Sequence, residues 1–216
     1  IDHPAFGAAV VGRLLEAEGY RVAIVPQPNW RDDLRDFRKL GAPRLFFGIS
    51  GGSMDSMVNH YTANLRLRHD DAYTPDGRHG MRPDYPSIVY SKILKQLFPD
   101  VPVVLGGIEA SLRRLTHYDY WEDKLKKCIL CESGADIILY GMGEKNTLQL
   151  CRELENGRSI KDVKDIPQTV YLAKKEDIPG GITDTDIVLH SHEECLRNTK
   201  AQAENFRHIE EESKKM

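Results

Sequence analysis

Short apolar runs alternate along the chain with segments in which apolar residues recur every three or four positions. The runs are typical of buried strands, and the wider spacing is typical of helices that bury one face. The predicted strands are residues 21–25, 44–49, 101–105 and 135–140, with an edge strand at 168–172. Predicted helices cover residues 4–19, 32–40, 50–65, 86–97, 109–115 and 120–130, and a further helix follows residues 141–144 and is capped by Gly157. This alternation predicts an α/β fold in which helices cover both faces of a parallel sheet.

The order of these elements predicts a three-layer, Rossmann-like parallel sheet with a C-terminal helix. Such a sheet begins with a strand that leads into the first helix, whereas here the helix at residues 4–19 comes first. We therefore expect the missing strand just upstream of Ile1, in a longer protein. The sheet domain is assigned to residues 1–190. Residues 191–216 are dense in Glu, Lys, Asn and Gln, and they predict one long connector or docking helix.

Composition narrows the classes of protein. A chain of 216 residues with net charge −3 suits one α/β domain with an appendage. The near-neutral balance argues against nucleic-acid binding by this domain, which usually needs a basic face. No run approaches the roughly 18 apolar residues of a membrane span, and the amphipathic first helix lacks the basic start of a signal peptide. The 4 cysteines do not suggest a disulfide framework, so we expect a cytoplasmic protein.

Glycine-rich turns follow three predicted strands at their C-terminal ends, at residues 50–53, 106–111 and 141–144. Open parallel sheets bind ligands outside this edge, and glycine lets a backbone approach a ligand closely. Each turn alone is explained by a tight strand-to-helix connection, and the three together leave a bound ligand or partner equally open. The candidate ligand-binding residues at this edge are Ser50, Gly51, Gly52, Gly106, Gly107 and Glu144.

Two polar segments could contact a substrate or another domain. Residues 66–85 form a long irregular stretch, and its His69-Asp70-Asp71 triplet has metal-ligand chemistry. Adjacent side chains rarely converge on one ion, so a solvated loop, or one ordered by Arg–Asp pairs, is the simpler interpretation. Residues 113–121 mix arginines with aromatics, a composition that suits phosphate and base binding or a domain interface; we favour the interface. The selected contacts are Arg68, His69, Asp70, Arg113 and Tyr118.

No catalytic or metal-binding residue is assigned. Cys128 and Cys131 form a CxxC pair, but a zinc site would need two further ligands at suitable spacing. Cys151 and Cys195 are distant in sequence, so packing is the favoured interpretation of the cysteines.

Several stretches resemble signature sequences of the YgiQ-like radical SAM family, and the resemblance extends over essentially the whole chain. They are Asp2-His3-Pro4-Ala5-Phe6-Gly7, Arg66-Leu67-Arg68-His69-Asp70-Asp71-Ala72-Tyr73-Thr74-Pro75, Gly106-Gly107-Ile108-Glu109-Ala110-Ser111-Leu112-Arg113-Arg114 and His117-Tyr118-Asp119-Tyr120-Trp121. The resemblance implies an N-terminal domain ahead of a radical SAM barrel. In that barrel a CxxxCxxC motif holds a [4Fe–4S] cluster that cleaves S-adenosylmethionine to a radical. The motif is absent here, so no cluster ligand is carried onto this chain.

The chain also resembles the cobalamin-binding domains of other radical SAM enzymes. Those domains have an Asp-x-His-x-x-Gly motif after the first strand, a serine after the third and a Gly-Gly pair after the fourth. Ser50 and Gly106-Gly107 match these points, whereas His3 directly follows Asp2 and three residues separate it from Gly7. The resemblance implies cobalamin as a candidate cofactor, bound with His3 as axial ligand or without a protein ligand. It also allows a domain that has lost the cofactor and kept the fold.

Three functional hypotheses follow. The first is an accessory domain of a radical SAM iron–sulfur enzyme that covers the active site of the downstream barrel, contacts its substrate and holds a corrinoid. It predicts exposed apolar surface at the loop edge. The second is a non-catalytic interaction module that keeps only the fold. A nucleotide-binding domain is the weakest, because residues 141–143 lack the third glycine of the dinucleotide fingerprint.

Overall fold

A four-stranded sheet forms the centre of the computed structural model, which describes residues 6–178 and 180–214. The strand order is β1-β2-β5-β6, with β1 (Phe47–Ser50), β2 (Val103–Gly106), β5 (Ile137–Leu139) and β6 (Thr169–Tyr171). The first three strands are parallel, and the edge strand β6 runs antiparallel to β5. The α/β class is therefore confirmed, but the prediction of a wholly parallel sheet is wrong at β6.

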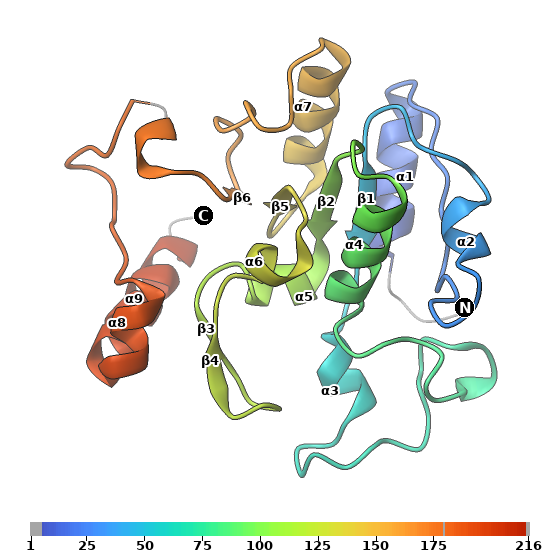
Figure 1. Cartoon of the computed structure of the whole chain (residues 1–216), viewed down its shortest axis with the longest axis horizontal. Coiled ribbons are helices and arrows are strands. Elements are labelled where there is room, and N and C mark those ends of the chain that lie inside the picture. The colour runs from blue at the N-terminus through green and yellow to red at the C-terminus, as the bar shows by residue number, and fades with distance from the viewer. Residues whose placement is uncertain (1–5, 179, 215–216) are drawn as a thin grey trace.

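Helices and a separate hairpin surround the sheet (Figure 1). The helices are α1 (Gly7–Ala17), α2 (Arg35–Arg38), α3 (Ser56–His60), α4 (Pro86–Leu97), α5 (Gly107–Leu112), α6 (Ile129–Ser133), α7 (Glu144–Glu155), α8 (His192–Arg197) and α9 (Thr199–Ser213). Two 3₁₀ turns lie at Pro75–Gly77 and Lys175–Asp177. The hairpin pairs β3 (His117–Asp119) with β4 (Lys124–Lys126). Among the described helices, none is long and apolar enough to span a bilayer.

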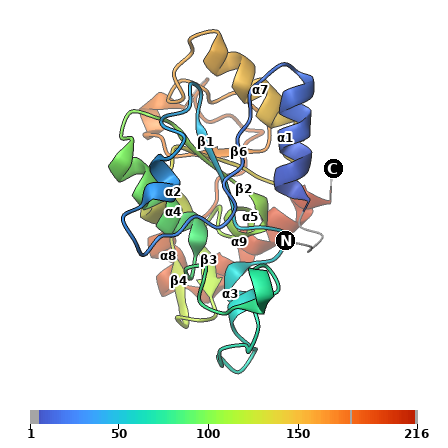
Figure 2. The same cartoon turned by 90° about the vertical axis from the view of Figure 1, so that its right-hand side faces the viewer.

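The buried core divides between the two faces of the sheet because successive side chains of a strand point to opposite sides. On β2, Val103 and Leu105 join one cluster with Ile88 and Leu94 of α4. Val104 joins the other cluster, which includes Leu150 of α7. Figure 2 shows α4 and α7 on different sides of the strands. The sheet is thus packed on both faces, and its strand ends stay available for connecting turns.

The predicted helix at residues 120–130 is wrong, since the hairpin and α6 occupy this region. Asp119 accepts hydrogen bonds from the backbone N–H groups of Trp121 and Glu122, each at 3.0 Å, and these bonds turn the chain after β3. Asp123 adopts a positive φ of 51° at the turn, which lets β4 return beside β3. The side-chain spacing that suggested a helix belongs to residues on a turned hairpin.

The predicted helix at residues 50–65 is much shorter than expected. Gly52 has a φ of 105°, and the helical segment starts only after Asp55, whose carboxylate accepts from the N–H of Met57 at 3.1 Å. It ends at Tyr61, which is extended and forms a β-bridge with Leu67. Local side-chain caps therefore decided the limits of α3.

The tail contains two helices where one was predicted. Asn198 interrupts it with extended backbone angles, and its side-chain oxygen accepts from the N–H of Lys200 at 3.0 Å, capping α9. Figure 1 shows both tail helices on the hairpin side of the sheet. Lys127 pairs with Glu193 of α8 at 2.9 Å. An N-cap inside a polar tail thus marks a new helix start.

Residues 21–25 were predicted as a buried strand, but they form no strand within the described part of the chain. They form no ladder with the described part of the chain, and Ile24 is 56% exposed. The run is apolar enough for a strand, but a strand also needs a partner for its backbone groups. The expected first strand and the loop with His3 lie outside the described residues.

Candidate functional site

The turns after β1 and β2 touch each other at the C-terminal edge of the sheet. Ser50 Oγ accepts a hydrogen bond from the N–H of Gly52 at 3.3 Å. Gly107 has a φ of 77°, and a Cβ at that position would lie 2.6 Å from Ser50 Oγ. Gly106 ends β2 opposite Ser50 in the ladder. The structure therefore brings these residues together, and the contact leaves no room between Ser50 and Gly107 for a ligand.

A buried carboxylate lies under the same turns. Glu109 is fully buried in α5, and its Oε1 accepts from the N–H of Ser87 in the first turn of α4 at 2.9 Å. Its Oε2 has no hydrogen-bond partner within the described residues, and a Cβ on Gly51 would lie 3.2 Å from it. Glu109 is not among the residues selected from the sequence; an acidic residue two positions after the Gly106-Gly107 pair was the available signal.

Arg113 lies in a buried ion pair, away from solvent. Its guanidinium contacts both carboxylate oxygens of Asp55, with Nη2 3.2 Å from Oδ1, and lies 5.1 Å from the ring centre of Tyr85. Burial lowers the pKa of Arg113, but the hydrogen bonds and charge of Asp55 outweigh it and raise the pKa above its ordinary value. Arg113 thus links α5 to α3 and is not placed to touch a substrate directly.

The hairpin is held to the domain by a buried contact of Asp119, and its other side is exposed to solvent. Tyr85 donates to Asp119 Oδ2 at 2.8 Å, and burial together with this acceptor raises the pKa of Tyr85 far above its ordinary value. Tyr118 is exposed, and its hydroxyl donates to Asp123 at 2.5 Å. Of the residues selected in this segment, Tyr118 is therefore the one that another domain could reach.

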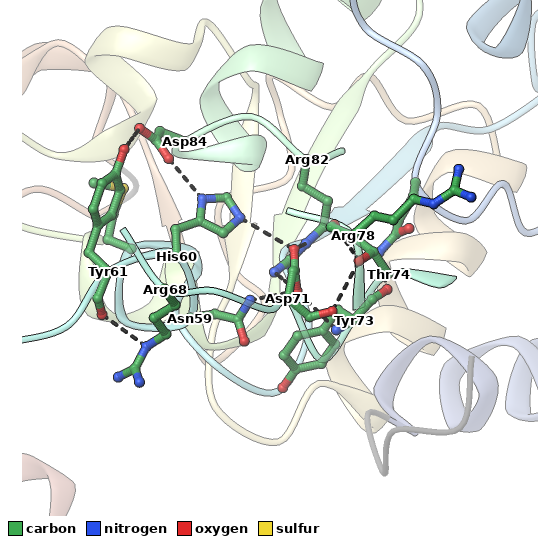
Figure 3. A network of polar contacts seen from close by, with 12 residues as sticks. Asn59, His60, Tyr61, Arg68, Asp71, Tyr73, Thr74, Arg78, Arg82 and Asp84 are labelled. Carbon is green, nitrogen blue, oxygen red and sulfur yellow. Dashed lines mark hydrogen bonds and ion pairs between the residues drawn. The ribbon is translucent and has the colours of Figure 1, made fainter. Parts of the chain in front are cut away.

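The irregular loop is ordered around Asp71, as Figure 3 shows. Asp71 is fully buried and accepts from Arg82 through Nε and Nη2, each at 3.0 Å. It also accepts from Asn59 Nδ2 at 2.7 Å and from the N–H of Tyr73 at 2.9 Å. Burial acts to raise the pKa of Asp71, but His60, Arg82 and the N–H of Tyr73 outweigh it and hold the pKa well below its ordinary value. An Arg–Asp pair therefore orders this loop, as one of the two simpler interpretations supposed.

His60 extends the same buried group of side chains toward Asp84. Its Nδ1 lies 2.7 Å from Asp84 Oδ1, which places the two in hydrogen-bond contact. Its Nε2 lies 3.6 Å from Asp71 Oδ2, an ion-pair distance that is too long for a hydrogen bond. Burial lowers the pKa of His60, but the two carboxylates outweigh it and raise the pKa. We call residues 59, 60, 71, 73, 82 and 84 the Asp71 network.

The residues selected from this loop lie at its surface. Arg68 is exposed, and its Nε donates to the carbonyl oxygens of Val58 and Tyr61 at 3.1 Å. His69 and Asp70 are exposed. No group of three metal-ligating side chains forms within residues 6–178 and 180–214. The triplet therefore splits, since Asp71 points inward and its two neighbours do not.

The third glycine-rich turn lies at the same edge. The N–H of Gly141 is 3.4 Å from Ser111 Oγ of α5, which joins the turn after β5 to the turn after β2. Glu144 is half-buried at the start of α7. Cys151 is one of the buried residues of α7, as expected for a packing role. Glu144 is thus placed at the edge, but it does not meet Ser50 or Gly107 through any bond seen here.

Apolar side chains are exposed around these turns. Leu112 of α5 is 57% exposed, and Met142, which follows β5, is 75% exposed. We call this set the apolar edge: Met54, Val58, Ile108, Leu112 and Met142. All five lie in segments that follow the C-terminal ends of the parallel strands β1, β2 and β5, so they belong to the same edge of the sheet. Apolar side chains gathered on one side are typical of an interaction surface.

Together these features define an α/β domain with a closed glycine-rich edge and no metal centre among its described residues. The whole chain, residues 1–216, matches the family described as Radical SAM N-terminal. The chain therefore belongs to the Radical SAM N-terminal family.

Curated relatives are considerably longer than this chain. A UPF0313 protein of Bacteroides thetaiotaomicron is 65% identical over 100% of this chain and 36% of its own length. A UPF0313 protein of Porphyromonas gingivalis is 65% identical over 99% of this chain and 33% of its own length. A UPF0313 protein of Geobacter sulfurreducens is 48% identical over 98% of the chain. The chain thus spans about a third of the length of such relatives. No solved structure matches it significantly.

Proposed function

We propose that this chain is the Rossmann-like N-terminal accessory domain of a YgiQ-like radical SAM enzyme. Its apolar edge packs against a radical SAM domain further along the same polypeptide and covers that domain's active site. Residues 191–216 connect the two parts. Membership of the Radical SAM N-terminal family supports this proposal, as does the greater length of the relatives.

The exposed apolar edge is the observation that carries the proposal. Ile108 and Leu112 lie four residues apart, so they project from the same side of α5. Leaving such side chains in water forgoes roughly 25 cal/mol for each Å² that a partner could bury. The relatives have about two-thirds of their length outside the part that matches this chain, which supports a partner surface within the same polypeptide.

The cluster and S-adenosylmethionine belong, in this proposal, to the rest of the polypeptide. The cysteines of this chain do not fit a [4Fe–4S] cluster, because Cys151 and Cys195 are buried on separate helices away from Cys128 and Cys131. When bound elsewhere, the cluster would supply the electron that cleaves S-adenosylmethionine to a radical. This domain's own residues would exclude water from that radical, and Tyr118 and Arg68 would contact the substrate or the neighbouring domain.

A corrinoid does not fit between the turns after β1 and β2. Ser50 and Gly107 are in contact there, and Gly51 packs on Glu109. Cobalamin therefore has no part in the proposed function. The closed edge favours the second hypothesis as the alternative, a module that keeps the fold and uses it only to bind another protein surface.

The test is a pair of substitutions in the full-length protein. Ile108→Ser with Leu112→Ser should uncouple the domains, which would speed proteolysis between them and lower the yield of 5′-deoxyadenosine from S-adenosylmethionine. Leu40→Ser is the matched control, because Leu40 is equally exposed but precedes β1 at the opposite end of the strand.

Two outcomes would count against the proposal. Unchanged proteolysis and unchanged S-adenosylmethionine cleavage in the double variant would exclude docking through the apolar edge. Domain uncoupling with normal cleavage would support the interaction module over the active-site cover.

A further inference from the structure

The outer edge of β1 is open. The N–H of Phe47 donates to the carbonyl of Pro102 at 2.9 Å, so Phe47 and Ile49 direct their backbone groups toward β2. In a parallel ladder the alternate residues point the other way, so Gly48 and Ser50 direct theirs away from the sheet. Both residues are exposed. The sheet therefore has room for another strand beside β1.

Residues 21–25 have the side-chain alternation of a strand, but they are not paired with another strand among the described residues. Val22 Cγ1 and Ile24 Cδ1 lie 3.7 and 3.4 Å from the point where a Cβ on Gly12 of α1 would stand. Alternate side chains thus face the same helix, as they do in a strand. The segment nevertheless makes no ladder with any described residue, and in Figure 1 the chain descends from the upper end of α1 toward α2.

The helices on either side of the sheet place the missing neighbour. α1 packs with α7, through Glu18–Arg152 at 2.9 Å and Tyr20–Glu155 at 3.0 Å. α2 lies on the α4 face, where the rings of Phe37 and Tyr90 are 5.6 Å apart. Successive crossovers on these opposite faces step in opposite directions across a sheet, because parallel crossovers are right-handed.

The direction of those steps leaves one position in the sheet for the strand that precedes α1. α2 and α4 share a face, so the chain steps from residues 21–25 to β1 and then to β2 in one direction. α1 lies on the other face, so the strand that feeds it lies on the β1 side of residues 21–25. β2 already occupies the inner edge of β1. The outer edge of β6 is separated from α1 by the width of the sheet.

We propose that residues preceding Ile1 in the natural protein form a parallel strand between residues 21–25 and β1. The strand pairs with Gly48 and Ser50 on one side and with residues 21–25 on the other. It makes β1 an interior strand and covers the exposed parts of α1.

The inserted strand would also change what lies beside Ser50. The strand order becomes 21–25, inserted strand, β1, β2, β5, and the order reverses between the inserted strand and β1. Open sheets bind ligands at that reversal. The face of Ser50 that points away from Gly107 would then border the ligand position of the completed domain.

Hydrogen exchange in the full-length protein, read at single-residue resolution, tests the inserted strand. Thr169 and Tyr171 of β6 are the internal control, because their N–H groups point away from β5 in the register of the β5–β6 ladder. We expect the amides of Gly48 and Ser50 to exchange at least about tenfold more slowly than those of Thr169 and Tyr171. A chain that starts at Ile1 should lose this difference.

Equal exchange at the four amides in the full-length protein would overturn the proposal. Protection of Gly48 that appears only at high protein concentration would also overturn it, since a second copy would then fill the edge. Gly48→Pro in the full-length protein gives a second readout. Proline is tolerated at a sheet edge but not in an interior strand. The variant should therefore unfold at lower urea than Thr169→Pro, and the reverse order would contradict an interior β1.

Discussion

The Asp71 network and the apolar edge are close in the sequence but opposite in chemistry. In the network, Asp71 is buried in hydrogen bonds with Arg82 and Asn59, so buried polar contacts order the irregular loop. The apolar edge follows regular strands but leaves side chains such as Leu112 in water. The irregular loop is nevertheless well ordered, whereas the segments that follow regular strands leave apolar side chains exposed. The difference predicts which substitutions will lower the free energy of unfolding of this chain in isolation.

Asp71→Asn should have the largest effect. The substitution leaves the buried guanidinium of Arg82 without its carboxylate, and breaking a buried ion pair costs about 3–5 kcal/mol. Urea unfolding of the variant should show a loss of this size. Asp70→Asn is the control, because Asp70 is exposed beside it and should leave the urea midpoint unchanged. Equal effects at the two positions would mean that the network does not stabilise the loop.

Gly107→Ala should cost at least about 2 kcal/mol, since a clash in a packed site and a non-glycine residue at positive φ each cost at least about 1 kcal/mol. The new methyl group would meet Ser50 Oγ at 2.6 Å. Gly134→Ala is the control, with a φ of 70° and open surroundings, so it isolates the backbone cost. Adding Ser50→Ala should recover part of the Gly107 loss. Purely additive losses would mean that the two turns are not in contact.

A smaller effect is expected from the protonation of His60. Its pKa is raised in the folded protein, so the protonated ring stabilises the fold below its ordinary pKa of about 6.5. That contribution disappears as the pH rises through the raised pKa. Urea unfolding between pH 6 and 9 should show a fall in stability that is weaker in His60→Gln. Parallel pH profiles for the two proteins would exclude a role for this ring.

Leu112→Ser should have the smallest effect on the chain studied alone. The side chain is already largely in water, so the free energy of unfolding should change by no more than about 0.5 kcal/mol. Leu105→Ser is the contrast, because Leu105 is fully buried on β2 and its loss should cost several-fold more. A large loss at Leu112 would show that the apolar edge packs within this domain and is not free for a partner.

Patterns in the sequence predicted most of the sheet but not its limits. The strands near residues 44–49, 101–105, 135–140 and 168–172 and the helix Pro86–Leu97 were all found, because long apolar periods depend on burial alone. The helix expected at residues 120–130 failed because Asp119 and Asp123 turn the chain through local hydrogen bonds and a positive φ. Such turns are hard to predict from the sequence when the apolar residues around them have helical spacing.

The place of the glycine-rich turns in the fold was predicted, but their contacts were not. The sequence placed Ser50 and Gly107 at one edge because parallel strands end together, but it could not show that they touch. Arg113 was selected as a substrate or interdomain contact, whereas it lies in a buried ion pair with Asp55, 58 positions away. Glu109 and Arg82 were missed for the same reason, since their partners are distant in sequence.

By itself, the sequence determined the class of fold, the place of the glycine-rich turns and the family resemblance. These follow from local periodicity and from residue types that act over a few positions. Only the tertiary structure decided which charges are buried and paired, which apolar side chains remain exposed, and that β1 has an open edge. Those properties depend on contacts between segments far apart in the chain, where burial makes each unmatched polar group costly and each exposed apolar face available to a partner.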